Sequence, residues 1–182
     1  MLAKIAITDK SVLNYFASRF GGHLRLMYFP HKYRFMFSKA TEYALRATIY
    51  IAQKGTEENK IGIDEISAAI DSPQSYTAKI LQLLRKNKKV IRSVSGPNGG
   101  FYMTEQAKKQ SVRVVLEAMG EDDVLEKCVL GLAKCSASKP CPMHSKYKVI
   151  KEQLIELFET KTIQQLADDI INGEGFINNR SK

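Results

Sequence analysis

Apolar residues recur at the spacing of an α-helix in a stretch that begins near residue 38. Between Ser38 and Lys54 the apolar side chains fall three or four positions apart, which is typical of an amphipathic helix. Ser38 is a suitable N-cap and Gly55 a suitable C-terminal stop. A first helix is therefore predicted over residues 38–54. Its apolar positions are Ala40, Tyr43, Ala44, Ala47 and Ile51.

Two further helices are predicted after a polar loop. The first spans about residues 64–70. The second runs from Pro73 to Lys86, with Ser72 as its cap and Pro73 in its first helical position. The spacing gives this second helix one apolar face and one polar face. The apolar face consists of Tyr76, Ile80, Leu83 and Leu84, and the polar face includes Gln74, Ser75, Lys79, Gln82 and Arg85.

The hydrophobic period changes to two after residue 89. Short strands are predicted at residues 90–94 and 101–103, around the turn sequence from Ser95 to Gly100. A helix-turn-helix followed by a hairpin is the order of a winged helix-turn-helix. The predicted fold is therefore mainly α, with a β-hairpin wing.

The last third of the chain is helical again. A helix is predicted over residues 111–119, ended by Gly120, and residues 121–142 have no regular period. A long helix follows from Pro142 to Lys161, and Thr162 can cap a last helix that ends at Ile171. The long helix carries a two-heptad apolar seam of Met143, Tyr147, Ile150, Leu154 and Leu157.

Composition narrows the class of protein. With 44 % hydrophobic and 26 % charged residues among 182, the chain has the make-up of a folded globular protein. It has neither an apolar run of membrane-spanning length nor a recognisable signal peptide. Three cysteines are too few and odd in number for a disulfide scaffold, so we expect a cytoplasmic protein without a membrane partner. The net charge of +9 favours a polyanionic partner.

The predicted winged helix concentrates this charge where DNA would bind. Residues 85–92 hold five cations and no acid at the junction of helix and hairpin. The first turns of the preceding helix are expected to read bases, and the hairpin tip to approach a groove or a phosphate. A basic run is also often only a solvated face, and Tyr76 fits the core as well as a phosphate contact. The DNA-binding candidates are Gln74, Ser75, Tyr76, Lys79, Arg85, Lys86, Lys88, Lys89, Arg92, Pro97 and Asn98.

A second group of residues has the chemistry of a metal site. Cys128, Cys135 and Cys141 lie within 14 residues, and His144 follows at the start of the long helix. Nearby lysines and a helix N-terminus favour thiolates. The residues by themselves leave three interpretations open: an iron-sulfur cluster, a zinc ion held by the same ligands, or three unliganded thiols that act as a redox switch. A thiol enzyme using Cys141 and His144 is disfavoured, because no oxyanion-hole motif accompanies them.

Taken together, these motifs resemble the Rrf2 family of bacterial winged-helix regulators, in particular its cluster-binding members of the IscR and NsrR types. The resemblance covers residues 36–173. The matching pieces are the opening sequence from Phe37 to Ala47, Ser75-Tyr76, Leu84-Arg85-Lys86, the wing from Gly96 to Phe101, and Cys141-Pro142-Met143-His144. The chain departs from IscR-type proteins at Ser95, at Ala78 and in the longer first cysteine spacing, so operator preference is not carried over.

The resemblance implies a transcription regulator, not an enzyme, that binds a palindromic operator on double-stranded DNA as a homodimer joined by its long helix. It implies a 2Fe-2S cluster held by the three cysteines and His144, or a 4Fe-4S cluster whose fourth ligand is the carboxylate of Glu42 from the partner subunit. Glu42 also suits the first turn of a helix without any metal. Repression in response to nitric oxide, redox state or cluster supply would be the corresponding function.

The expected organisation has five parts. Residues 36–120 form the winged helix-turn-helix, 121–142 the Cys-rich cluster-binding loop, 143–173 the dimerisation and terminal helices, and 174–182 a tail. Residues 1–35 are a basic extension with five of the nine net positive charges. Because Met36 directly precedes the first helix signature, one hypothesis is that the functional protein starts there. The alternative is a basic arm that orders on a polyanion.

Overall fold

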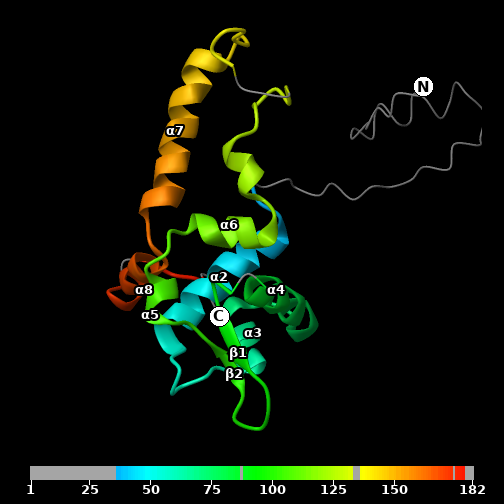
Figure 1. Cartoon of the computed structure of the whole chain (residues 1–182), viewed down its shortest axis with the longest axis vertical. Helices are drawn as coiled ribbons and strands as arrows, with labels where there is room; N and C mark the ends of the chain where they lie inside the picture. The colour runs from blue at the N-terminus through cyan, green and yellow to red at the C-terminus, as the bar shows by residue number, and fades with distance from the viewer. Residues whose placement is uncertain (1–35, 87, 133–135, 174, 179–182) are drawn as a thin grey trace, which may run out of the picture. The chain divides into compact units, whose positions relative to one another are not determined.

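The computed structural model describes residues 36–86, 88–132, 136–173 and 175–178 (Figure 1). The predicted extension of residues 1–35 and the candidate ligand Cys135 lie outside the described residues. Within the described part of the chain, no helix combines the length and apolar character needed to cross a membrane.

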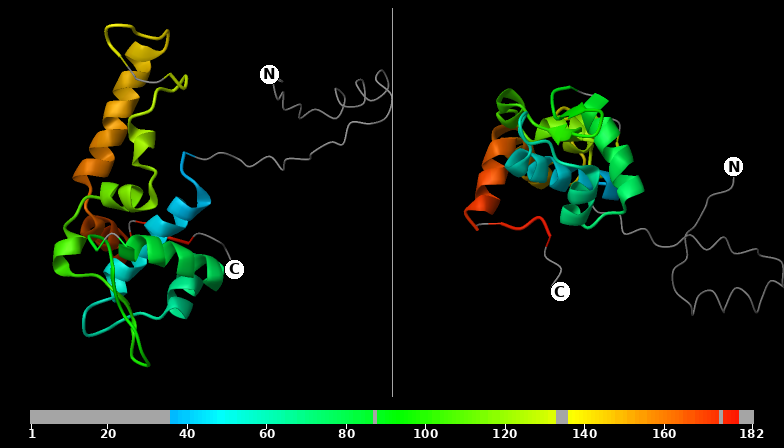
Figure 2. Two further views of the ribbon diagram at one scale, coloured as in Figure 1. Left: turned by 45° about the vertical axis from the view of Figure 1, so that its right-hand side comes forward. Right: turned by 90° about the horizontal axis from the view of Figure 1, so that it is seen from below.

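Helix α2 (Lys39–Lys54) is the centre of the fold and begins as predicted. The hydroxyl of Ser38 accepts a hydrogen bond from the backbone N–H of Thr41 at 3.2 Å, and the N–H of Gly55 closes the last turn on the carbonyl of Ile51. One side of the helix is buried, through Ala44, Ala47 and Ile51 among others. Figure 2 shows α2 surrounded by the other helices of the core.

The helix-turn-helix consists of α3 (Ile63–Ile70) and α4 (Gln74–Lys86). Helix α3 ends on Asp71, which adopts the left-handed conformation at φ 53°. The predicted serine cap of α4 does not form, because the Ser72 hydroxyl is buried without a hydrogen-bond partner. Instead the Pro73 carbonyl accepts from the N–H of Thr77 at 2.9 Å, and the helix starts at Gln74.

The buried face of α4 differs from the predicted one at two positions, since Leu81 replaces Leu83 and Thr77 replaces Tyr76. Leu83 was expected on the apolar side, but it is 44 % exposed, and Leu81 is buried in its place. One residue of an α-helix advances about 100° around the axis, so the 77–80–81–84 row and not the 76–80–83 row faces α2. Tyr76 is half-buried at the edge of the core. The buried residues of α4 are Thr77, Ile80, Leu81 and Leu84.

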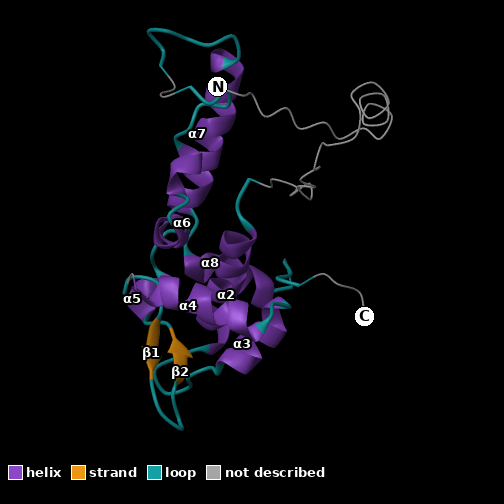
Figure 3. Cartoon of the chain, turned by 90° about the vertical axis from the view of Figure 1, so that its right-hand side faces the viewer, coloured by secondary structure: helices purple, strands orange, loops and turns teal. Residues whose placement is uncertain are grey.

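The wing is a two-stranded antiparallel hairpin of β1 (Arg92–Val94) and β2 (Gly100–Tyr102), with Ser93 opposite Phe101 (Figure 3). A third segment, unforeseen from the sequence, joins it: Ile61 and Phe101 exchange two backbone hydrogen bonds of 2.9 Å. The linker between α2 and α3 thereby anchors the base of the wing. A short helix, α5 (Glu105–Lys108), follows and was also not predicted.

The C-terminal third forms α6 (Arg113–Met119), a 3-10 turn η1 (Asp122–Leu125), the long α7 (His144–Thr160) and α8 (Ile163–Ile171). Gly120 ends α6 in the left-handed conformation, as predicted. Thr162 caps α8 in a full capping box with Gln165. Helix α7 starts at His144, two residues after the predicted start at Pro142, and Met143 is its N-cap.

Helix α8 returns to the winged-helix core. Its buried residues Ile163 and Ala167 belong to the same apolar cluster as Ala44, and Gln53 of α2 donates to the carbonyl of Ala167 at 3.3 Å. A β-bridge between Ser111 and Thr162 fixes the junction of α7 and α8 beside the start of α6. Helix α7 itself leaves the core, with no fully buried residue along its length (Figure 1).

Candidate DNA-binding surface and cysteine site

The exposed side of α4 carries a row of four polar side chains at helical spacing. Ser75, Lys79, Gln82 and Lys86 are all exposed and lie opposite the buried face. Ser75, Lys79 and Lys86 are among the predicted DNA-binding residues. Gln82 was assigned to the polar side but not to the candidates, although its spacing of three from Lys79 was a sufficient signal.

Two predicted DNA-binding residues of α4 are engaged within the protein. The amide nitrogen of Gln74 donates to a carboxylate oxygen of Asp64 in α3. The ring of Tyr76 packs edge-on against Tyr43, with centroids 5.9 Å apart, and the guanidinium of Arg46 lies 5.1 Å from the Tyr43 ring centre. Both side chains therefore hold α4 against the neighbouring helices.

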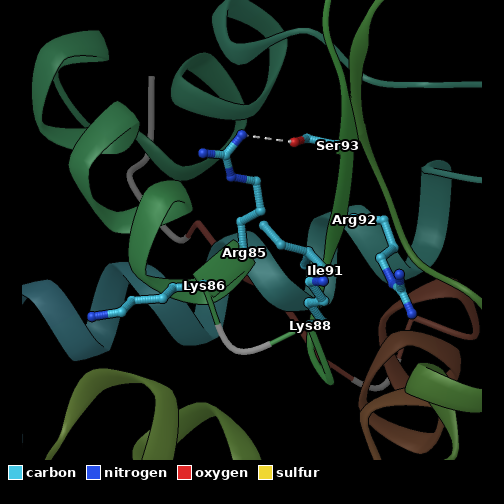
Figure 4. A pocket seen from close by; sticks show the side chains of 6 residues that line it. All are labelled: Arg85, Lys86, Lys88, Ile91, Arg92 and Ser93. Carbon is cyan, nitrogen blue, oxygen red and sulfur yellow. Dashed lines mark hydrogen bonds between the residues drawn. The ribbon is translucent and has the colours of Figure 1, made fainter.

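The junction between α4 and the wing forms a basic hollow of about 400 Å³. Arg85 donates to the hydroxyl of Ser93 at 3.4 Å, which links the end of the helix to the first strand (Figure 4). The lining contains four cations and no carboxylate, and Lys89 is exposed nearby. Such a surface suits a phosphate of a nucleic-acid backbone. The lining residues are Arg85, Lys86, Lys88, Ile91, Arg92 and Ser93.

The wing tip presents the predicted Pro97 and Asn98 at the centre of a tight turn. The N–H of Gly99 donates to the carbonyl of Gly96 at 2.9 Å, and Gly96 has φ 111°. Both central residues are exposed. The tip therefore offers a small, uncharged surface that can come close to a groove.

Two of the three predicted cysteine ligands meet in the structure. Cys128 is buried, Cys141 is half-buried, and their side chains are hydrogen-bonded. A hydrogen bond from the backbone N–H of Leu130 lowers the pKa of the Cys128 thiol. Burial raises this pKa, and a second hydrogen bond, from the backbone N–H of Leu132, lowers it again. The positive charge of Lys151 on α7 lowers the pKa of Cys128 further. This environment favours the thiolate, which is the form that binds a metal.

The remaining predicted ligands lie apart from this pair or outside the described residues. His144 is one turn from Cys141, and its backbone N–H donates to the Cys141 carbonyl at 2.9 Å. Glu42 is bound within its own helix, 2.6 Å from Lys39 and 3.8 Å from Arg46. Within the described residues, which lack 133–135, no three His, Cys, Asp or Glu side chains are grouped closely enough to hold a metal ion.

The apolar seam of α7 is largely exposed in the single chain. Ile150 is 60 % and Leu157 55 % exposed, and Met143 is also exposed. The neighbouring face of the helix makes the contacts within the chain, for example between Phe158 and Phe37, whose ring centroids lie 5.5 Å apart. The seam therefore has no full cover among the described residues of one chain.

Comparison with known proteins gives consistent results. The family model Rrf2, described as an iron-dependent transcriptional regulator, matches residues 37–169. An HTH-type transcriptional regulator of Aquifex aeolicus (strain VF5) is 32 % identical over 73 % of this chain and 92 % of that protein. The regulator IscR of Pectobacterium atrosepticum is 24 % identical over 70 % of this chain and 76 % of its own length.

Solved structures share the fold at low sequence identity. CymR, the global cysteine regulator of B. subtilis, superimposes with a TM-score of 0.59 at 16 % identity over 74 % of this chain and 98 % of that one. The IscR structure of T. potens gives a TM-score of 0.57 at 16 % identity, over 76 % of this chain and 90 % of that one. The two relatives compared by sequence are named as HTH-type transcriptional regulators, and CymR is named as the global cysteine regulator.

Proposed function

Because the chain belongs to the Rrf2 family of transcriptional regulators, we propose that it binds a palindromic DNA operator as a homodimer and that an iron-sulfur cluster sets its operator affinity. The observation that carries the DNA-binding part is the exposed row on α4 next to the acid-free basic hollow. The second helix of a helix-turn-helix enters the major groove with its exposed side, and the cations of the hollow suit phosphate contacts beside it. Such a regulator acts in the cytoplasm, where the chromosome is.

The exposed seam of α7 supports the homodimer. Met143, Ile150 and Leu157 present apolar surface at heptad spacing to solvent. Packing this seam against a second copy would bury it and would set two α4 helices at a fixed distance. A fixed distance between two identical readers corresponds to a palindromic operator with two half-sites.

The contact between Cys128 and Cys141 supports the cluster. The donor set fits: the two thiols lie together next to backbone donors and Lys151, and His144 lies one turn beyond Cys141. We assign Cys128, Cys135 and Cys141 as thiolate ligands. The fourth ligand is His144 in a 2Fe-2S site, or Glu42 of the partner subunit in a 4Fe-4S site. A bound cluster supplies redox and ligand-exchange chemistry that responds to oxidants or nitric oxide.

Control then follows from the position of the cysteine loop between η1 and α7. Ligation at Cys128 and Cys141 would tie the segment after η1 to the start of α7, and would thereby hold the helix that carries the seam. A change at these thiols would then alter how the two subunits are set and so the spacing of the α4 helices. The cluster acts as a switch only if the two states differ in operator affinity.

The test is the operator affinity of one preparation in two states. Protein purified without oxygen is analysed for visible absorbance, iron and acid-labile sulfide, and its operator is isolated by selection from random DNA. The Kd for that operator is then measured before and after the cluster is removed. We expect matched iron and sulfide and a change in Kd of at least about fivefold. Equal affinities would overturn the cluster control but not the DNA binding.

A second candidate function rests on the same cysteine contact. Two hydrogen-bonded thiols, one of them with a lowered pKa, suit oxidation by a peroxide, which would join them in a disulfide without any metal. In this case the purified protein is colourless, cannot be reconstituted with iron and sulfide, and changes its operator affinity on oxidation. Zinc held by the same ligands would give a colourless protein with one zinc per chain and no response to mild oxidation.

A further inference from the structure

We propose that Gln82 is the side chain of α4 that recognises adenine, and that Gln74, the other glutamine of the helix, does not read a base. The inference rests on the proposed DNA-binding function and assigns one specificity-determining residue within it. It rests on a difference between two chemically identical side chains, of which one is engaged within the protein and the other is exposed.

The first observation is the engagement of Gln74. Its amide nitrogen donates to the carboxylate of Asp64 in α3, across the turn of the helix-turn-helix. Adenine is recognised through a pair of hydrogen bonds, one from N6 to the amide oxygen and one from the amide nitrogen to N7. The amide nitrogen of Gln74 is the atom that such a pair requires, and it is already used by Asp64. Breaking this contact would leave a carboxylate unpaired beside the DNA.

The second observation is the position of Gln82. It lies three residues after Lys79 and four before Lys86, on the row directly opposite the buried residues of α4. Its side chain is exposed, and neither its amide oxygen nor its amide nitrogen has a hydrogen-bond partner among the described residues. Both atoms of the amide are therefore available to a base edge.

The length of the row fits a short run of base pairs. At 1.5 Å per residue, Ser75 and Gln82 are separated by about 10 Å along the helix axis. This distance corresponds to about three base pairs at 3.4 Å each. Lys79 lies between them and suits guanine. The row thus reads, in order, a base tolerated by serine, a guanine contacted by Lys79, and an adenine contacted by Gln82.

The cations that flank Gln82 support its role in specificity. Lys79 and Lys86 precede and follow it on the same face, and Lys86 also lines the basic hollow, whose cations suit the phosphates of the DNA backbone. An uncharged amide contributes little to the salt-dependent attraction between protein and DNA. The flanking cations hold the helix in the groove, and the amide between them contributes the discrimination between bases.

The experiment is a selection from random double-stranded DNA with four full-length proteins purified without oxygen: wild type, Gln82→Ala, Gln74→Ala and Gln82→Glu. For the wild type we expect an adenine in each half-site. Gln82→Ala should lose the preference at this position alone, with a fall in discrimination of about tenfold, and Gln74→Ala should keep it. Gln82→Glu should change the preference to cytosine, because a carboxylate accepts from the N4 amino group.

The outcomes separate this inference from the function on which it rests. If Gln82→Ala selects the same sequences as the wild type, or if Gln74→Ala loses the adenine instead, the assignment of Gln82 is wrong although DNA binding stands. If the wild type enriches no sequence, the proposed function fails, and the inference fails with it. Circular dichroism and thermal melting of each variant check the fold, which a change at an exposed position should not disturb.

Discussion

The guanidinium of Arg113 in α6 lies 2.5 Å from the carboxylate of Glu159 in α7 and 3.1 Å from that of Glu126, which follows η1. One side chain thus connects the winged-helix core, the segment that leads to Cys128, and the long helix. Partial burial lowers the pKa of Arg113, but the two carboxylates outweigh it and raise the pKa above its usual value. Lys151 reinforces the joint by donating to the carbonyl of Glu126. Any movement of α7 relative to the core has to alter this cluster.

Removal of the guanidinium should loosen the joint. We expect Arg113→Ala to lower the free energy of unfolding by about 1 kcal/mol, because the partners are partly exposed. We also expect it to reduce the difference in operator affinity between the cluster-bound and cluster-free protein. The matched control is Lys148→Ala, which breaks the exposed pair with Glu152 inside α7 and should change neither quantity. If Arg113→Ala retains the full difference in affinity, the joint does not transmit the signal.

The cysteines should be necessary for cluster retention. We expect Cys128→Ala, Cys135→Ala and Cys141→Ala each to reduce bound iron and acid-labile sulfide to background, because each removes a thiolate ligand. The proteins should remain folded dimers, since neither Cys128 nor Cys141 belongs to the main apolar cluster. Metal analysis and sedimentation measure the two properties. Normal iron and sulfide content in any of these variants would remove that cysteine from the ligand set.

Two lysines of the DNA-binding surface should have different roles. Lys88 lines the basic hollow, so Lys88→Ala should weaken binding to all sequences alike and reduce the slope of log K against log salt by about 1. Lys79 lies in the middle of the exposed row of α4, so Lys79→Ala should change the preferred sequence. Titrations of specific and random DNA at several salt concentrations distinguish the two effects. Identical behaviour of the two variants would contradict this division.

The α7 seam should determine the oligomeric state. Ile150→Glu places a charge in the proposed interface, where an unpaired buried charge costs about 3 kcal/mol, so the Kd of the dimer should rise at least a hundredfold or so. Val149 is similarly exposed but lies about 100° away around the helix axis, and Val149→Glu should leave the dimer intact. Sedimentation equilibrium gives both constants. Equal dissociation by the two variants would place the interface elsewhere.

Two glycines offer a matched test of the wing anchor. A Cβ at Gly100 would lie 2.7 Å from the carbonyl oxygen of Ile61, whereas a Cβ at Gly62 meets nothing within 4 Å. We expect Gly100→Ala to lower the free energy of unfolding by about 1–3 kcal/mol and to weaken DNA binding, because the wing has to move away from its anchor. Gly62→Ala should change stability by less than about 0.5 kcal/mol. Urea denaturation compares them, and equal effects would exclude the close approach as the cause.

The helix caps, helix ends and strands could be predicted from the sequence because each depends on a few neighbouring residues. Capping by Ser38 and Thr162, the stop at Gly120 and the two-residue period of the wing depend on a few neighbouring residues, and each appears in the structure. The start of α7 was misplaced, since a proline marks a suitable helix start without requiring one. The basic run at residues 85–92 could also be predicted, because its residues are consecutive in the sequence.

Only the tertiary structure decided which of several chemically similar residues are buried or engaged and which are exposed to a partner. Leu83 and Leu81 are equivalent by composition, and only the rotation of α4 against α2 exposes the first and buries the second. Gln74 and Gln82 are the same amide, but Asp64, ten residues before Gln74, engages one of them. The pairing of Cys128 with Cys141 and of Arg113 with Glu159 likewise joins distant segments. Such contacts depend on how helices pack across the core, and no pattern of neighbouring residues contains that information.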